Sequence, residues 1–251
     1  MSIYTKYFYD GQKRGSLQSA RVIIPLILEY SQPESVIDVG CGTGTWLSVC
    51  KEYGINQYLG IDGDYIDPEM LLIAEEKYLK CDLSKPFYLD KEFDLVISLE
   101  VAEHIPENCA DCFVNSLVKL GPVILFSAAI PFQGGAYHVN EQWPEYWIER
   151  FQKHGHVVID CLRKKIWQNA SVDPWYAQNI FIFVRKDQLA CYPLLRTEFE
   201  RGCNLPFSLV HPRMWVLMHD AQAKRLLRSS WSLLPPPLRS ALKQGVRRLL
   251  G

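Results

Sequence analysis

The sequence predicts an α/β protein with a doubly wound, mostly parallel sheet and helices on both faces. Short apolar runs typical of buried strands alternate with amphipathic segments between residues 16 and 186. Acidic residues follow several of these runs, and the carboxyl ends of parallel strands are where ligands bind in such sheets. Because strand–helix–strand crossovers are right-handed, the alternation places helices on both faces.

The elements are expected in a regular order. Residues 16–30 carry apolar side chains at helical spacing after a serine start signal. The expected strands are residues 35–40, 57–62, 78–83, 93–101, 121–131, 156–165 and 179–186, and the later helices are residues 45–54, 68–78, 108–120 and 142–155. No obvious helix separates the last two strands, which predicts one antiparallel strand near the sheet edge.

Length and composition indicate one large domain and a small extension. The chain has 251 residues, 48% of them hydrophobic. We expect the domain to span residues 1–186, with N-terminal lid helices in which Tyr4, Tyr7, Phe8 and Tyr9 either cover the site or form a frayed end. Residues 187–251 are predicted to be a basic, mainly helical extension.

Charge differs sharply between these two parts. Residues 187–251 hold ten Lys and Arg against four Asp and Glu, a net charge of +6, whereas the other residues hold 17 against 24, a net charge of −7. An acidic main body argues against a nucleic-acid partner. Residues 237–251 form a basic amphipathic pattern that suits a membrane surface, a partner protein or the domain's own core. The oligomeric state is left open.

The cysteines and the hydropathy pattern favour a cytoplasmic protein. The N-terminus lacks the apolar core of a signal peptide, and no stretch approaches the length of a transmembrane span. The eight cysteines are therefore expected to be free thiols. Cys109 and Cys112 form a CxxC pair without a second pair at zinc spacing, so they are interpreted as structural, and no metal site is expected.

The segment DVGCGTGTW, residues 38–46, predicts a nucleotide-binding turn after the first strand. Its glycines, Gly40, Gly42 and Gly44, have G-x-G-x-G spacing rather than the G-x-G-x-x-G of dinucleotide sites. Asp38 would repel a pyrophosphate but suits a cationic amino group, which S-adenosylmethionine carries. Asp62, at the end of the second strand, is placed to accept hydrogen bonds from ribose hydroxyls.

Taken together, VIDVGCGTGTW, YLGIDGD, CDL and FDLVISLEVAEHIP resemble the first four motifs of class I S-adenosylmethionine-dependent methyltransferases. GSLQSA, HVNEQWPEYW and PWYAQN resemble bacterial enzymes of secondary-metabolite and surface-saccharide clusters. The resemblance implies a Rossmann-like seven-stranded sheet whose last strand is antiparallel. It also implies S-adenosyl-L-methionine as cofactor, with S-adenosyl-L-homocysteine as product. The cofactor-binding residues it implies are Asp38, Gly40, Gly42, Gly44, Asp62, Gly63, Asp82, Leu83 and Glu100.

Histidines are the candidates for a general base, because methylation of a hydroxyl requires loss of a proton near neutral pH. His138 and His104 both follow strands on the expected cofactor side. Aromatic and amide side chains near them suit a sugar, peptide or polycyclic acceptor. The candidate substrate residues are Asn140, Glu141, Trp143, Trp175 and Gln178.

The sequence therefore predicts methyl transfer from S-adenosylmethionine to a small molecule, with a hydroxyl oxygen favoured as acceptor. N-methylation of an amine, carboxyl methylation and a non-catalytic cofactor-binding protein stay open as alternatives. The fourth strand ends in SLEVAEH and lacks the Asn/Asp-Pro-Pro-Tyr motif of enzymes that methylate nucleic-acid bases. A nicotinamide dehydrogenase is disfavoured by the glycine spacing and by Asp38.

Overall fold

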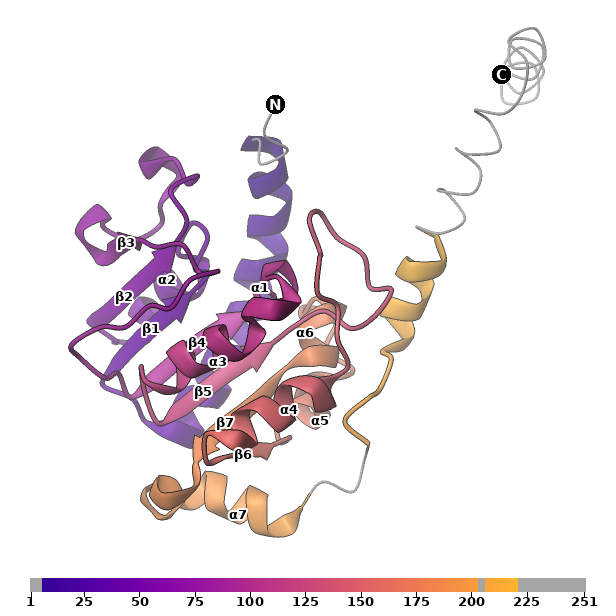
Figure 1. Ribbon diagram of the computed structural model, residues 1–251. Helices are drawn as coiled ribbons and strands as arrows, with labels where there is room; N and C mark the ends of the chain where they lie inside the picture. The colour runs from indigo at the N-terminus through magenta and orange to yellow at the C-terminus, as the bar shows by residue number, and fades with distance from the viewer. Residues whose placement is uncertain (1–5, 203–205, 221–251) are drawn as a thin grey trace, which may run out of the picture. The chain divides into compact units, whose positions relative to one another are not determined.

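The computed structural model describes residues 6–202 and 206–220 of the chain. Contacts divide the chain into two units, one ending at His211 and the other beginning at Pro212. In the second unit, residues 212–220 form a helix. The first unit contains the sheet and the helices that cover it (Figure 1).

Seven strands form a single sheet in the described part of the chain, in the order β3-β2-β1-β4-β5-β7-β6. The strands are β1 (Ser35–Val39), β2 (Gln57–Asp62), β3 (Tyr78–Lys80), β4 (Leu95–Leu99), β5 (Val123–Ser127), β6 (His156–Ile159) and β7 (Phe181–Arg185). Among them, β7 alone runs antiparallel to its neighbours, β5 and β6. The predicted mostly parallel sheet, with its last strand antiparallel and next to the edge, is confirmed.

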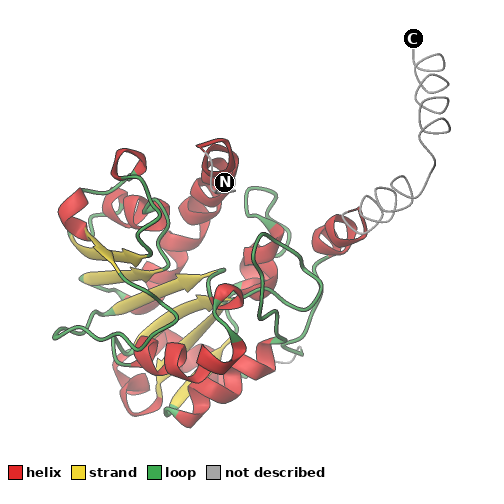
Figure 2. Ribbon diagram, turned by 45° about the horizontal axis from the view of Figure 1, so that its top comes forward, coloured by secondary structure: helices red, strands yellow, loops and turns green. Residues whose placement is uncertain are grey.

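The α-helices connect and cover these strands (Figure 2). They are α1 (Lys6–Ser31), α2 (Thr45–Glu52), α3 (Ala110–Val118), α4 (Pro144–Lys153), α5 (Arg163–Ile166), α6 (Pro174–Asn179) and α7 (Pro193–Arg201). Short 3-10 helices are η1 (Pro68–Met70), η2 (Glu75–Lys77), η3 (Ala102–His104), η4 (Glu107–Cys109) and η5 (Lys186–Cys191).

Two apolar cores lie on the two faces of the sheet, as expected for a doubly wound fold. One core joins α1, α2 and α6 to side chains such as Val36, Ile97 and Leu125. The other joins α3 and α4 to the alternate residues of the same strands, Ile37, Val96 and Ile124. Because successive strand residues point to opposite faces, β1 contributes to both cores and is buried along its whole length.

Two expected elements differ from the structure. Residues 68–78, predicted as one helix, form η1, η2 and the start of β3. Of the apolar residues there, Ile73 is buried but Leu72 is 43% exposed, so no continuous apolar face supports a helix. The strand expected over residues 156–165 ends at Ile159, and α5 and α6 lie between β6 and β7, where no helix was expected.

The predicted division after residue 186 stays a prediction. Residues 187–211 belong to the same contact unit as the sheet, and α7 packs against α1 and β6. The predicted lid, Tyr4 with Tyr7, Phe8 and Tyr9, and the amphipathic segment 237–251 lie outside the residues whose side chains the structure describes. Within the described residues, none of the helices has the length and apolarity needed to cross a membrane.

Candidate active site

The candidate site lies where the carboxyl ends of β1, β2, β3 and β4 meet. A cavity of about 870 Å³ opens there, and a smaller one of about 120 Å³ adjoins it through Gly40, Gly42 and Glu100. The larger cavity is lined by residues that follow these strands: Gly40, Gly42, Asp62, Gly63, Asp64, Tyr65, Lys80, Cys81, Asp82, Leu83, Ser84, Glu100, Val101, His104, Ile105 and Tyr137. It thus gathers segments distant in sequence.

The glycine turn after β1 has a left-handed backbone at Gly40, Gly42 and Gly44, a conformation that favours glycine. Gly40 has a φ of 81°, and a Cβ there would lie 2.4 Å from the side chain of Val101. Gly42 has a φ of 53°, but a Cβ there would meet no atom within 4 Å, because this residue faces the cavities. Gly44 caps the N-terminus of α2 and is absent from the described linings of both cavities.

Asp62 is fixed by hydrogen bonds from both sides of its carboxylate. Its Oδ2 accepts the N–H of Gly42 at 2.7 Å, and its Oδ1 accepts the N–H of Gly63 at 2.7 Å. The hydroxyl of Tyr65 also donates to Oδ1. Burial raises the pKa of Asp62, and these donors oppose the rise. Asp62 therefore links the glycine turn to the end of β2.

Asp38 contributes a buried carboxylate to the smaller cavity. The residue is 2% exposed, and its Oδ2 has no hydrogen-bond partner among the described residues. Burial, with a smaller contribution from the charge of Asp62, raises its pKa well above the usual range. Ser16, Trp46 and Tyr176 line the same cavity. An unpartnered carboxylate in such a place suits a cationic ligand group.

Asp82 and Leu83 line the larger cavity just after the end of β3. The carboxylate of Asp82 accepts hydrogen bonds from the N–H of Ser84 at 3.1 Å and from its hydroxyl at 2.6 Å, and it pairs with Lys85 at 2.9 Å. These contacts lower the pKa of Asp82 to about 2. Asp82 is therefore ionised and held within its own turn.

Glu100 lines both cavities and has a strained backbone, with a φ of 55°. Its carboxylate accepts hydrogen bonds from Gln133 at 2.8 Å and from Asn179 at 3.1 Å. Burial raises the pKa of Glu100, while these amides oppose the rise. The network thus connects the end of β4 to the loop after β5 and to α6.

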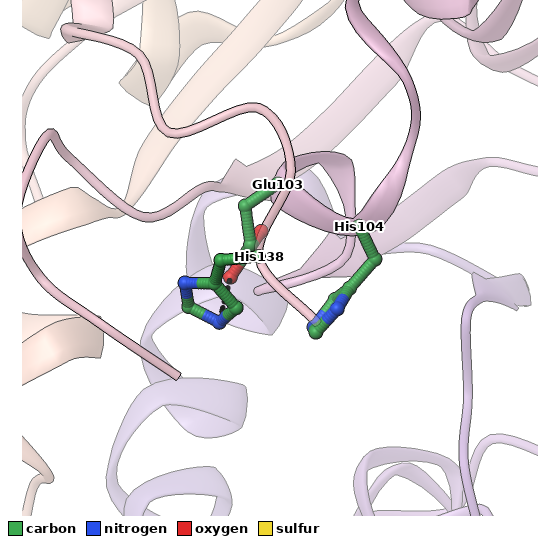
Figure 3. A group of neighbouring side chains, drawn as sticks. All are labelled: Glu103, His104 and His138. Atoms are coloured by element: carbon green, nitrogen blue, oxygen red, sulfur yellow. Dashed lines mark ion pairs between the residues drawn. The ribbon is translucent and has the colours of Figure 1, made fainter. Parts of the chain in front are cut away.

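His104 and His138 meet beside a buried carboxylate (Figure 3). Their rings contact edge to face, with centroids 4.9 Å apart. The Nε2 of His138 lies 3.9 Å from Oε1 of Glu103, whose side chain is 1% exposed. Burial, with the charge of His138, lowers the pKa of His104; burial, with the charges of Glu100 and Glu141, raises that of Glu103 well above its usual range.

The five predicted substrate residues are absent from the described linings of both cavities. Asn140 is buried within the loop after β5, and Glu141 organises that loop by accepting the N–H groups of Phe132 and Gly134. Trp143 is 41% exposed at the start of α4, and Trp175 packs partly buried against the core beside α1. The fifth, Gln178, is 1% exposed and accepts the N–H of His211. Direct substrate contact by these residues stays a prediction.

Several residues at the site were not predicted from the sequence. Tyr65, Lys80 and Tyr137 line the larger cavity, and Glu103 supplies the buried carboxylate beside the histidines. Tyr137 and Glu103 directly precede the predicted His138 and His104 in sequence, so the two histidines could have pointed to them. Tyr65 and Lys80 carry no motif that would single them out.

A family model described as "Methyltransferase domain" matches residues 15–160. A search of curated proteins gave no match. The sugar N-methyltransferase KedS8 from Streptoalloteichus sp ATCC 53650 is similar in structure, with a TM-score of 0.54 at 16% identity, covering 74% of this chain and 97% of KedS8.

Two further solved structures share the fold. CalS10, an amino pentose methyltransferase from Micromonospora echinaspora solved with its bound cofactor, has a TM-score of 0.52 at 16% identity, covering 74% of this chain and 99% of that one. DesVI from Streptomyces venezuelae has a TM-score of 0.52 at 16% identity, covering 71% and 95%. At these identities the likeness shows the fold, which is the predicted Rossmann-like one.

Proposed function

This chain belongs to the methyltransferase-domain family and is an S-adenosylmethionine-dependent methyltransferase, and we propose that it methylates a hydroxyl oxygen of a small molecule. The cofactor supplies an electrophilic methyl group on a sulfonium sulfur. The protein's task is then to align the acceptor and to promote loss of its proton. The observation that carries the proposal is the cluster of Glu103, His104 and His138, which reaches the main cavity through His104.

The smaller cavity suits the amino-acid part of the cofactor. The buried, unpartnered carboxylate of Asp38 would pair with the ammonium group. Gly40 and Gly42 would let the cofactor approach the backbone closely, and Gly44 would support the turn at the start of α2. Glu100, which lines both cavities, would face the methionyl end.

The larger cavity suits the nucleoside. Asp62 would accept hydrogen bonds from the ribose hydroxyls, with the backbone of Gly63 beside the adenine ring. Asp82 would accept from the adenine amino group, and Leu83 would supply a backbone contact. Because Asp82 is ionised and half exposed, it keeps acceptor capacity beyond its bonds to Ser84 and Lys85.

The histidine cluster is the part that favours a hydroxyl acceptor. A neutral amine attacks a sulfonium methyl group without a strong base, and a carboxylate acceptor is already ionised at neutral pH. A hydroxyl group must lose its proton as the oxygen–carbon bond forms and the carbon–sulfur bond breaks. We therefore assign the acceptor's activation to His138 and His104, with Glu103 opposite the Nε2 of His138.

N-methylation is the second candidate because KedS8 is described as a sugar N-methyltransferase and CalS10 as an amino pentose methyltransferase. Both names also support a sugar as the acceptor class. The loop after β5 that bears His138 and Tyr137 borders the cavity in which such an acceptor would bind.

Matched acceptors test the proposal. Each acceptor pair would carry a hydroxyl or an amino group at the same position of one sugar, and the product would be examined by mass spectrometry for the gain of one CH2 group. Methylation of the hydroxyl member, with fragments placing the group on oxygen, is expected. Methyl transfer to the amino member alone would overturn the assignment of a hydroxyl acceptor. Tight binding of NADH, without methylation that depends on S-adenosylmethionine, would overturn the assignment of methyl transfer itself.

A further inference from the structure

We propose that Glu103, His104 and His138 bind a divalent transition-metal ion at the edge of the main cavity. One carboxylate oxygen and one ring nitrogen from each histidine lie within 4.8 Å of one another (Figure 3). No metal site is expected from the sequence, because Cys109 and Cys112 lack a second cysteine pair and the two histidines are the candidates for a general base. The structure brings an acidic side chain, that of Glu103, beside the two rings.

Glu103 supplies an observation that a proton-transfer pair alone leaves unexplained. Its side chain is 1% exposed, and neither carboxylate oxygen makes a hydrogen bond of good geometry among the described residues, although the backbone N–H groups of Glu103 and Ala129 oppose the rise of its pKa. Burying an ionised carboxylate without hydrogen bonds is costly, so such groups in proteins hold a proton, pair with a cation or coordinate a metal. The nearest described group able to carry positive charge is His138, whose Nε2 is 3.9 Å from Oε1, beyond hydrogen-bond distance.

Both histidine rings are oriented as metal ligands usually are. The Nδ1 of His138 lies 2.9 Å from Oε1 of Glu141, and the Nδ1 of His104 lies 3.3 Å from the carbonyl oxygen of Tyr137. Each acceptor favours the tautomer with its proton on Nδ1, which leaves the lone pair of Nε2 free. A carboxylate or carbonyl behind a ligating histidine is the recurrent outer support of metal sites.

The backbone holds the two ligand-bearing segments together. The carbonyl oxygen of Glu103 accepts the N–H groups of Val139 at 2.9 Å and Asn140 at 3.0 Å, so the loop after β5 is tied to η3. A Cβ at Gly135 would lie 2.1 Å from Nε2 of His138, so glycine at that position leaves room for the ring. The site is therefore supported by main-chain contacts on both sides.

The ligand set of two imidazoles and one carboxylate determines which metal ions the site would prefer. Nitrogen ligands favour Mn²⁺, Fe²⁺, Co²⁺ or Zn²⁺ over Mg²⁺ and Ca²⁺, which prefer all-oxygen sites. Ligands at about 2.1 Å from one ion lie roughly 3–4 Å apart, so binding requires the three side chains to close slightly. Glu100 is bonded to Gln133 and Asn179 and is not counted as a ligand.

The role of the ion, unlike its binding, rests on the proposed function. Because His104 lines the cavity, an open coordination position there would accept a hydroxyl of the acceptor. The ion would lower the pKa of that hydroxyl so that its proton leaves to water. The oxygen then forms a bond to the methyl carbon while the carbon–sulfur bond breaks and its electron pair stays on sulfur. In this form the histidines act as ligands rather than as bases.

The site is tested by titrating metal-stripped protein with Mn²⁺ alone and following the binding by calorimetry and electron paramagnetic resonance. We expect saturable binding of one Mn²⁺, weaker binding of Mg²⁺, and a higher melting temperature with Mn²⁺. Glu103→Gln and His138→Ala should abolish the binding and the thermal shift. Glu141→Gln should weaken binding by about 10- to 100-fold, as loss of an outer support does. His154→Ala, which changes an exposed histidine, is the matched control.

Binding that is absent in the wild-type protein, or unchanged in Glu103→Gln, overturns the metal site. Glu103→Gln removes a buried unpartnered charge, so a fold preserved by circular dichroism separates loss of the ligand from unfolding. Methyl transfer that survives metal removal overturns the ion's catalytic role while leaving the proposed function intact. Mn²⁺ binding without methylation of a hydroxyl would support the metal site and overturn the proposed hydroxyl acceptor.

Discussion

The hydroxyl of Tyr65 donates a hydrogen bond to Oδ1 of Asp62, the oxygen that also accepts the N–H of Gly63. The other oxygen accepts the N–H of Gly42. The carboxylate that we assign to the ribose is therefore already held by three donors, one of which is a half-exposed side chain. A ribose hydroxyl that binds Asp62 has to share this acceptor with Tyr65 or displace it.

Tyr65→Phe is expected to strengthen binding of S-adenosylhomocysteine by about two- to tenfold, because it removes a competing hydrogen bond of ordinary strength. Calorimetry measures the change directly. Tyr53→Phe, at an exposed tyrosine, serves as the control. Weaker binding in Tyr65→Phe would mean that the phenol contacts the cofactor rather than competing with it.

Asp62→Ala is expected to weaken S-adenosylhomocysteine binding by roughly 10- to 100-fold, since charge-assisted hydrogen bonds to both ribose hydroxyls are lost. The N–H groups of Gly42 and Gly63 also lose their acceptor, so the melting temperature should fall as well. Asp90→Ala, at an exposed position, controls for general loss of negative charge. Unchanged affinity in Asp62→Ala would remove Asp62 from the cofactor site.

Gly40→Ala and Gly42→Ala are expected to separate folding from binding. A Cβ at position 40 collides with Val101, so this variant should lose stability markedly. At position 42 the Cβ enters open space between the cavities, and only a strain of roughly 1 kcal/mol from the positive φ is expected. Gly42→Ala should therefore melt near the wild-type temperature and yet bind the cofactor poorly. Thermal unfolding and calorimetry on both variants check this, and equal losses in both properties would contradict it.

The positions of the strands along the chain and the glycine turn were predictable because they depend on local signals. Each strand is a short apolar run, and the acidic residues at the ends of β1, β2 and β4 could be located without knowing the tertiary contacts. The spacing of Gly40, Gly42 and Gly44 needed only the positive φ values that such a turn requires. Parallel pairing then brings these ends to one edge of the sheet.

The acceptor side was less predictable because it depends on tertiary packing. Trp175 and Gln178 belong to α6, a helix of six residues whose direction in space the sequence pattern does not define. The side chain of Trp175 packs against the core, and the amide oxygen of Gln178 accepts the N–H of His211. Glu103 lies beside a predicted histidine, but its burial follows from the loop after β5 folding over η3.

Gln178→Ala is expected to lower stability rather than to alter acceptor binding. The amide of Gln178 is buried and accepts the N–H of His211, so its loss leaves an unsatisfied donor at a cost of roughly 1–3 kcal/mol. Denaturant unfolding should show this loss, while Gln168→Ala, an exposed glutamine, should be neutral. A higher KM for the acceptor at unchanged stability would instead support Gln178 as a substrate residue.

Asp38→Asn is expected to stabilise the free protein while weakening cofactor binding. Burial and the charge of Asp62 raise the pKa of Asp38, so the folded protein holds this proton more tightly than the unfolded chain. The ionised carboxylate therefore costs stability in full at pH values above its raised pKa, and the cost shrinks as the pH falls below that pKa until it is gone below the pKa of the unfolded chain. Asparagine removes the charge, so the variant should gain roughly 1–3 kcal/mol near neutral pH, a gain that shrinks in acid. Denaturant unfolding of both proteins over a pH series measures this difference.

With S-adenosylhomocysteine bound, the stability advantage of Asp38→Asn over the wild type should shrink by about 1.4 kcal/mol or more, because the ammonium group loses its partner and affinity falls about tenfold or more. A variant less stable than wild type at neutral pH, or one that binds equally well, would show that Asp38 serves the fold rather than the cofactor.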